Sequence, residues 1–316
     1  MQERNLRHFW QSLFYVLCIG CTMVEKIKTG LSIFLILLLL PYVMVMLSGQ
    51  QNEKEAVASM AAEKEEQQQL EQWVLEILPG QIPVTYELEA LKAQAVIARS
   101  NLAFRMQEEG LSADQLSESK LTGWDMKHYS LMELREIWGE ALFEGYYEKI
   151  CRAVEETAGE TLVYNGSYVD IPYHAVSAGQ TRDGSLLGES YPYLTRVDCP
   201  GDLQAEDFLT VAKLDSQKFP AIQALEIISR DEAGYVTKIR VGEEVITGEE
   251  FRYRADLPSG SFTLENRDGA WVAVVKGLGH GFGLSEYQAQ LQASQGKTYL
   301  EILQYFYGEM ECISFS

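Results

Sequence analysis

Histidine and basic residues are scarce in this sequence of 316 residues. It contains four histidines, and its 26 lysines and arginines are outnumbered by 46 aspartates and glutamates, which gives a formal net charge of -20. No block of basic residues interrupts the acidic chain. Because nucleic-acid phosphates call for clustered lysine and arginine, this composition argues against nucleic acid as a partner. The hydrophobic content of 47% is enough for a substantial core, so a disordered protein is also excluded.

Cysteine is also rare, and its spacing argues against two kinds of site. Of the five cysteines, Cys18 and Cys21 have the CxxC spacing, but they lie in an apolar leader with no second ligand pair nearby. The other three are too few and too far apart for a disulfide framework, and each histidine is isolated. We therefore expect no zinc, no other metal and no cofactor.

One long hydrophobic run is present near the N-terminus. Residues 31–47 are uncharged and mostly apolar, at the lower limit for crossing the roughly 30 Å hydrocarbon layer. Since Lys26 and Lys28 precede the run, the positive-inside rule predicts a cytoplasmic leader over residues 1–30 and a single transmembrane helix over residues 31–47. The large domain would then lie outside the cell membrane. A cleaved signal peptide is the alternative, but no clear A-x-A cleavage site follows the run, and Met23 is an alternative start.

A polar spacer follows over residues 48–72. From residue 50 onward it contains no glycine or proline and is rich in alanine, glutamate, glutamine and lysine. This composition favours a semi-rigid helix, and a disordered linker is the equal alternative. Residues 73–316 remain for one α+β domain of mixed helices and antiparallel strands.

The stretch GQIPVTYELEALKAQAVIARSNLAFRM, residues 80–106, is expected to lie at the centre of this domain. Apolar side chains recur in it at three- and four-residue steps, which predicts one buried helix over residues 87–106. These apolar positions are Leu88, Leu91, Ala95, Ala98, Leu102 and Met106. Lys92, Gln94 and Arg99 interrupt a run of alanines. By pattern alone they are the solvated face of a core helix, and the alternative is a helix that carries a site.

Further elements follow from periodicity and turn residues. Helical spacing predicts a helix over residues 130–157, and Asn165-Gly166 predicts a hairpin between strands at residues 161–164 and 168–173. Segments in which apolar and polar residues alternate then predict a meander of strands and a later buried strand, with a short helix between them. These are strands at residues 224–229, 235–241 and 243–246, a helix at residues 248–254 and a strand at residues 271–276.

The text EALKAQAVIARS resembles the SpoIID/LytB family of bacterial cell-wall proteins, in which E-M-P precedes EALKAQAVAART. Two later stretches match the same family in order: YHAVSAGQTRDG with YPYLTRVDCPGD, and GLGHGFGLSEYQAQ with GKTYLEILQYFY. Sporulation members of this family are membrane-anchored lytic transglycosylases that cut peptidoglycan glycan strands lacking stem peptides. The resemblance thus implies such strands and the membrane as partners, a role in engulfment, and other sporulation cell-wall proteins as candidate partners.

The resemblance also raises a problem of chemistry. The family's catalytic glutamate is the E of E-M-P, and Gln81 stands at that position. The family motifs would place Arg99 and His280 beside it as catalytic residues. A lytic transglycosylase needs a carboxyl group that protonates the glycosidic oxygen and then takes a proton from the C6 hydroxyl, and a glutamine amide cannot do this. Two interpretations remain: a glycan-strand lyase, or a degenerate homologue that binds glycan or organises a complex.

A second set of residues is assigned to substrate binding by the same resemblance. It comprises Lys92, His174, Ser177, Gly179, Thr181, Tyr193, Gly279, Ser285 and Glu286. Structural alternatives exist, because an isolated His174 is more often structural, Tyr193 fits a core equally well, and Ser285 with Gln288 forms a capping box. Glu286 replaces a glutamine of the family motif, and it is the one substitution that would compensate for Gln81.

The run GLGHGFGLS excludes two other classes of site. Its glycines lack the G-x-G-x-x-G spacing and no Walker lysine follows, so it is not a phosphate loop. It predicts a glycine-lined turn that presents His280 and Ser285 at the entry of a helix. A serine hydrolase built on Ser177 or Ser285 is disfavoured, because neither serine lies in a G-x-S-x-G elbow.

Overall fold

The computed structural model describes residues 28, 31, 34, 35, 38–40, 60, 61, 63–220 and 224–315. The chain divides into two compact units, Met1–Lys64 and Glu65–Ser316. Most of the predicted transmembrane helix at residues 31–47 lies outside the described residues, as do most of the leader and the Cys18 and Cys21 pair. Within the described residues, no helix combines the length and the apolar character needed to cross a membrane.

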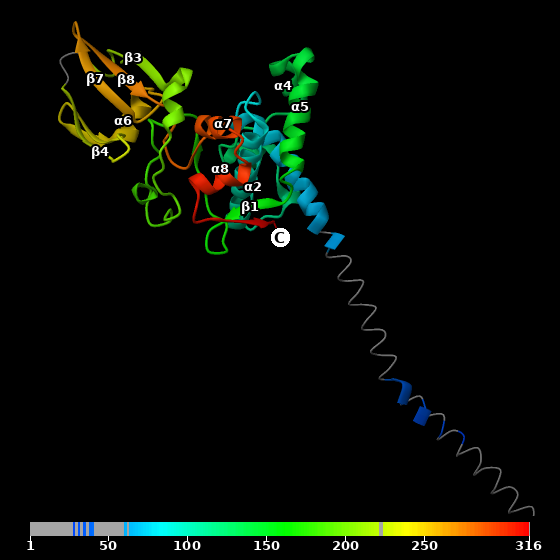
Figure 1. The fold of residues 1–316 in the computed structure, drawn as a ribbon. Coiled ribbons are helices and arrows are strands. Elements are labelled where there is room, and N and C mark those ends of the chain that lie inside the picture. The colour runs from blue at the N-terminus through cyan, green and yellow to red at the C-terminus, as the bar shows by residue number, and fades with distance from the viewer. Residues whose placement is uncertain are drawn as a thin grey trace, which may run out of the picture. The chain divides into compact units, whose positions relative to one another are not determined.

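The second unit contains both helices and mainly antiparallel strands, so the α+β class is confirmed (Figure 1). The helices are α2 (Leu88–Glu109), α3 (Glu118–Gly123), α4 (Leu131–Trp138), α5 (Glu140–Glu155), α6 (Gly248–Arg254), α7 (Glu286–Ser294) and α8 (Tyr299–Phe306). The strands are β1 (Glu160–Val163), β2 (Tyr173–His174), β3 (Leu209–Lys213), β4 (Leu225–Arg230), β5 (Val236–Val241), β6 (Glu244–Thr247), β7 (Ser261–Arg267), β8 (Ala270–Lys276), β9 (Leu284–Ser285) and β10 (Glu311–Ser314).

Two hydrophobic cores organise this unit. The larger one packs α2 against α5, α7, α8 and β1, and the smaller one lies among β3, β5, β6, β7, β8 and α6. Figure 1 shows the two groups of elements side by side, with the strands β3, β4, β7 and β8 in one and the helices α2, α5, α7 and α8 in the other. The predicted single domain therefore has two cores.

The buried helix at the centre of the fold is α2, as the periodicity predicts. Gly110 follows it with φ 64°, a left-handed conformation that glycine adopts without strain. A second helix, which includes residues 63–81, packs against the same core through one apolar face. Its buried residues are Leu70, Val74, Ile77 and Leu78. The compact unit thus includes residues of the expected spacer, and residues 63–72 are helical.

The predicted helix over residues 130–157 is divided into α4 and α5. Gly139 separates them with φ 73°, a value outside the helical range. Ser130 accepts a hydrogen bond from the Glu133 N–H, and the Glu133 carboxylate accepts one from the Ser130 N–H, so α4 begins with a capping box. The continuous apolar spacing concealed the break because the period resumes on the other side of Gly139.

The predicted hairpin at Asn165-Gly166 is only partly formed. Asn165 and Gly166 both have positive φ, as a type I′ turn requires, and Tyr164 forms an antiparallel bridge with Ser167. Beyond that bridge β1 pairs with the distant β10, and β2 pairs in parallel with β9. The prediction of a second hairpin strand at residues 168–173 is therefore wrong, because β1 and β2 each pair with a distant strand and not with each other.

The strand meander is confirmed. Strands β4, β5 and β6 form one antiparallel sheet in that order, and α6 follows directly with Thr247 as its N-cap. Strand β8, the predicted buried strand, lies between β3 and β7. Both sheets contribute to the smaller core.

Candidate functional site

Gln81 ends the helix that includes residues 63–81 and begins the segment Gln81–Tyr86. Its side chain is half-buried, and its Oε1 accepts a hydrogen bond from Gln94 Nε2 at 2.9 Å. Gln94 comes from α2 and is completely buried, and its own Oε1 has no partner in the described residues. The two amides form a neutral pair, and neither group can gain or lose a proton near neutral pH.

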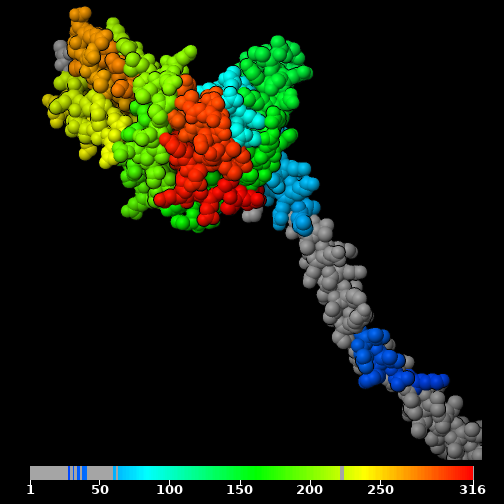
Figure 2. Space-filling view, in the orientation of Figure 1, coloured from blue at the N-terminus to red at the C-terminus, as the bar shows by residue number. Residues whose placement is uncertain are grey.

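The segment Gln81–Tyr86 is held between two helices. Lys149 of α5 donates from Nζ to the carbonyl of Val84 at 3.1 Å and to the carbonyl of Tyr86. On the other side, Gln290 of α7 accepts a hydrogen bond from the Glu87 N–H at 2.5 Å. Burial lowers the pKa of Lys149. Figure 2 shows a hollow in the surface. The green atoms of α4 and α5 form one side of it, the orange atoms of α7 form the other, and cyan atoms, the colour of the chain near the start of α2, lie between them.

Glu286 is the first residue of α7, and it lies within electrostatic range of Tyr86 in the same segment. It is 7% exposed, and no hydrogen bond or ion pair to its carboxyl group exists within the described part of the chain. Burial raises the pKa of this carboxyl to about 8. Tyr86 lies close enough that burial and the charge of Glu286 together raise its pKa to about 12, and the pKa of Tyr173 is raised in the same way.

The glycine loop, residues 277–283, forms the turn that the sequence predicts. All four of its glycines have positive φ. Each of them also stands close to other segments; for example, a Cβ at Gly279 would lie 2.7 Å from the Cβ of His174, and a Cβ at Gly283 would lie 1.8 Å from the carbonyl oxygen of Pro172. These glycines therefore bring β2 and β9 into contact.

His174 and His280 are brought together by this contact, with ring centroids 5.8 Å apart. His174 is 3% exposed, its Nδ1 lies 3.0 Å from the Phe282 carbonyl oxygen, and its Nε2 is buried with no partner among the described residues. The Phe282 N–H donates to His280 Nδ1 at 3.1 Å. Burial and the neighbouring His280 lower the pKa of His174 to about 3, and burial with Arg252 and Arg182 lowers that of His280 to about 4. Both rings are therefore neutral at pH 7.

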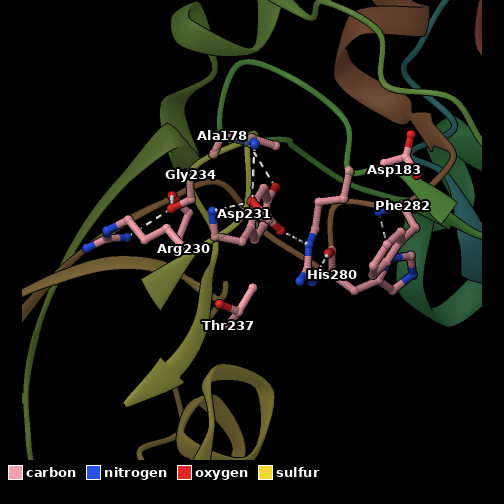
Figure 3. Close-up of polar contacts among 12 residues, drawn as sticks. Ala178, Asp183, Arg230, Asp231, Gly234, Thr237, His280 and Phe282 are labelled. Carbon is pink, nitrogen blue, oxygen red and sulfur yellow. Dashed lines mark hydrogen bonds and ion pairs between the residues drawn. The ribbon is translucent and has the colours of Figure 1, made fainter. Parts of the chain in front are cut away.

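A buried ion pair supports the glycine loop from the side of the smaller core. Arg182 donates from Nε to Asp231 at 2.7 Å and from Nη1 to the His280 carbonyl at 3.2 Å. Its guanidinium lies over the rings of Tyr235 and Phe282, at 4.8 and 4.4 Å. Figure 3 shows Asp231 between Ala178 and His280, with Arg230 on its other side. Sequence patterns do not distinguish Asp231 or Tyr235 from their neighbours, because Asp231 follows one predicted strand of the meander and Tyr235 begins the next.

Asp202 links Ser177 to Ser285, the N-cap of α7. This completely buried carboxylate accepts hydrogen bonds from the Ser177 N–H at 2.7 Å and from the Ser285 hydroxyl at 2.8 Å. Burial raises its pKa, and these hydrogen bonds oppose the rise. Ser285 also accepts from the Gln288 N–H at 3.4 Å, so its predicted capping role is confirmed, although the Gln288 side chain bonds to Gly201 instead. Asp202 lies within the segment CPGD, where no sequence pattern distinguishes it from the other aspartates.

Arg99 lies in the core. It is 0% exposed, and its Nε and Nη2 donate to the two carboxylate oxygens of Glu71 at 2.8 and 2.6 Å. Its Nη1 donates to the carbonyl of Glu160 at 2.9 Å. Because protein groups use these donors, the geometry gives no support to the catalytic role that the resemblance implied. Arg99 instead ties α2 to the preceding helix and to β1.

Lys92 is likewise occupied by protein partners. Its Nζ lies 2.6 Å from Glu89 and 2.5 Å from Glu156, and 5.7 Å from the centroid of the Tyr299 ring. Burial alone would lower its pKa, but the hydrogen bonds to Glu156 and Glu89 outweigh burial and raise it. The lysine therefore joins α2 to α5 and α8, and its predicted contact with substrate finds no support in this geometry.

Three more predicted binding residues have packing roles. Tyr193 is 1% exposed and donates its hydroxyl to the Asp170 carbonyl at 2.6 Å, so the core alternative holds for this tyrosine. Thr181 is buried, and its hydroxyl accepts from the Val197 N–H at 2.8 Å. Gly179 has φ 108°, and its N–H donates to the Ser177 hydroxyl at 3.1 Å. Of the described residues, no three His, Cys, Asp or Glu side chains gather as metal ligands.

Comparisons with known proteins agree with the sequence resemblance. Residues 59–164, which include Gln81 and α2, match the family model described as SpoIID, stage II sporulation protein. Stage II sporulation protein D of Bacillus amyloliquefaciens is 28% identical over 251 residues, which cover 75% of this chain and 72% of the relative. The protein of the same name from Bacillus subtilis (strain 168) is 28% identical over 249 residues, with the same coverage.

A more distant relative has a different name. The amidase enhancer of Bacillus subtilis (strain 168) is 21% identical over 295 residues, which cover 73% of this chain and 39% of that protein. The family model, the relatives and the ordered motifs agree in direction, and the chain is similar to stage II sporulation proteins of the SpoIID family.

Proposed function

We propose that this protein binds stem-peptide-free glycan strands of peptidoglycan during sporulation, from an N-terminal membrane anchor and with its large domain outside the cell. Similarity to the SpoIID family supports the sporulation role, and the name amidase enhancer of one relative points to the cell wall. The hollow between α5 and α7 is the groove we assign to the strand. Lys149 and Gln290 fix its floor by bonding the backbone of residues 84–87.

The amide at position 81 is the observation that carries this proposal. Gln81 occupies the position of the family's glutamate, and it accepts a hydrogen bond from Gln94 in a neutral amide pair. Glutamine is nearly isosteric with glutamate, so it preserves shape and hydrogen bonding but removes the proton that cleavage must move twice. We therefore expect glycan binding with cleavage that is very slow or absent.

The test compares the full chain in detergent with its Gln81→Glu variant. We expect both proteins to co-sediment with stem-peptide-free glycan strands, and Gln81→Glu to raise the formation of 1,6-anhydro ends by at least about 100-fold, measured by mass spectrometry. Gln217→Glu adds the same charge at an exposed position and should change neither result. If the native protein does not co-sediment with the strands, the proposal is wrong.

An active lytic transglycosylase is the second candidate, and one observation favours it. Glu286 is a buried carboxyl beside the segment that carries Gln81, and it remains protonated at neutral pH. A protonated carboxyl is what the family's chemistry requires of its general acid.

A further inference from the structure

Glu286 is an unusual residue to find at its place in the fold. A buried carboxyl group normally accepts hydrogen bonds or pairs with a cation, because desolvation without compensation costs free energy. Glu286 is 7% exposed, and within the described residues no donor and no basic side chain reaches its carboxyl. Stability alone would favour an amide or an apolar side chain here.

Its position at the start of α7 does not explain the carboxyl group. Acidic residues in a first helical turn are stabilised by the free N–H groups there. In α7, however, Ser285 already caps the Gln288 N–H, and no described backbone N–H donates to Glu286. The carboxyl group therefore lacks the interaction that would make it an ordinary helix-start acid.

A second unpartnered group lies next to it. Strand β2 pairs with β9 in parallel, with His174 opposite Ser285, the residue before Glu286. His174 Nε2 is buried without a partner in the described residues, while its Nδ1 is bonded to Phe282. A neutral imidazole in this state has a free acceptor for a hydroxyl or amide N–H of a ligand. His174 on β2 and Glu286 at the start of α7 thus both present a polar group without a partner in the described residues.

The titratable groups near Glu286 come from several neighbouring elements. Tyr86 from the segment before α2 and Tyr173 from β2 lie within electrostatic range, and the buried carboxylate of Asp202 bonds to the adjacent Ser285. All of them are neutral or acidic at neutral pH, as is neutral His174 on β2. None of these groups favours ionisation of Glu286, and a carboxyl that keeps its proton in a cleft is a functional-site candidate.

We propose that Glu286 is the general acid and base of a slow glycan-strand cleavage in this protein, in place of the carboxyl that position 81 lacks. This inference rests on the proposed function, because it needs the glycan strand in the hollow beside Tyr86. Tyr86 belongs to the segment that begins at Gln81, so Glu286 reaches the same part of the groove from the side of α7.

The chemical step balances without any co-reactant. The Glu286 carboxyl donates its proton to the glycosidic oxygen, and the bond between that oxygen and C1 breaks with its electron pair leaving on the oxygen. The resulting carboxylate then takes the proton of the C6 hydroxyl of the same sugar, and the C6 oxygen forms the new bond to C1. The products are a shortened strand and a 1,6-anhydro end, and Glu286 regains its proton.

The experiment follows 1,6-anhydro ends and glycan binding together, with the full chain in detergent and stem-peptide-free strands. We expect native protein to form anhydro ends slowly and Glu286→Gln to reduce the rate by at least about 100-fold while still co-sedimenting with the strands. Glu309→Gln, at an exposed position, serves as the matched control and should keep the native rate. Adding Gln81→Glu to the Glu286→Gln protein should restore cleavage.

The pH profile provides an independent readout. Cleavage by the native protein requires protonated Glu286, so its rate should fall as the pH rises through about 8. Two results would overturn the inference and leave the proposed function standing. In the first, the native protein binds the strands but does not cleave them; in the second, Glu286→Gln cleaves them at the native rate. Absence of binding by the native protein would overturn the proposed function itself.

Discussion

At the scale of single residues, the family text and the local environment give different information. The resemblance assigns roles to Arg99 and Lys92, yet their charged ends are bonded to Glu71 and to Glu89 and Glu156. A sequence motif specifies the residue type but not its partner, and the partner decides whether a charge is available to a ligand. Glu286 is the opposite case, since its missing partners are visible only in three dimensions.

Glu286 should also make stability depend on pH. In the unfolded chain this carboxyl ionises from about pH 4.5, whereas burial holds its pKa in the folded chain at about 8. Folding then requires proton uptake, so Glu286 lowers the free energy of unfolding by about 1.4 kcal/mol for each pH unit between the two values. We predict that Glu286→Gln raises the melting temperature relative to native protein, and that the gain grows from about pH 5 to about pH 8.

Thermal melts at a series of pH values would measure this gain. Glu309→Gln is again the control, because an exposed carboxyl should give no gain that varies with pH. A gain from Glu286→Gln that stays constant across the series would mean that the carboxyl ionises normally in the folded protein.

At the scale of elements, the glycine loop allows a sharper prediction. Gly283 has φ 69°, and a Cβ there would lie 1.8 Å from the carbonyl oxygen of Pro172, which accepts a hydrogen bond from the Tyr307 hydroxyl. Gly283→Ala must therefore displace the backbone before β2. We predict a loss of about 3 kcal/mol or more in the free energy of unfolding, measured by urea denaturation.

Gly110 offers a matched comparison for this substitution. It has φ 64°, and a Cβ there would meet nothing within 4 Å. Gly110→Ala carries the same backbone strain without the collision and should cost only about 1 kcal/mol. Equal losses for the two variants would show that backbone strain alone, and not the approach of Pro172, requires glycine at residue 283.

The local elements were the predictable part of the fold. Period-two segments and turn glycines located β4, β5 and α6, because those strands pair with sequence neighbours. The pairing of β1 with β10 could not be predicted, since more than half of the domain sequence separates Glu160 from its partner Ser314. Single-sequence patterns report which face is buried, but not which distant segment covers it.

For the candidate site, too, local features could be predicted from the sequence and long-range contacts could not. The glycine loop, the Ser285 cap and the proximity of His174 to His280 agree with the ordered motifs. Asp202 and Asp231 could not be singled out, because their importance comes from buried donors on other segments. One acidic residue out of a total of 46 has no distinguishing pattern in the sequence.

At the scale of the whole domain, Arg182 connects the two cores. Its ion-pair partner Asp231 precedes β5, whose side chains fill the smaller core, while Phe282 beneath its guanidinium belongs to the larger one. The side chains of Arg182 and Asp231 are only 10% and 5% exposed, so the pair is largely shielded from solvent. Removing one partner of such a pair is costly because the other charge remains buried.

We predict that Arg182→Leu uncouples the two cores. Leucine can still pack against Tyr235 and Phe282, but Asp231 loses its cation, and the free energy that makes the cores unfold together falls by about 3 kcal/mol or more. Calorimetry should show one unfolding transition for the native domain and two, or one markedly broader, for the variant.

Arg196→Leu removes an exposed pair with Glu232 and should leave a single transition, because such surface pairs contribute about 1 kcal/mol or less. A single sharp transition for Arg182→Leu, merely shifted to lower temperature, would mean that contacts other than this ion pair join the cores.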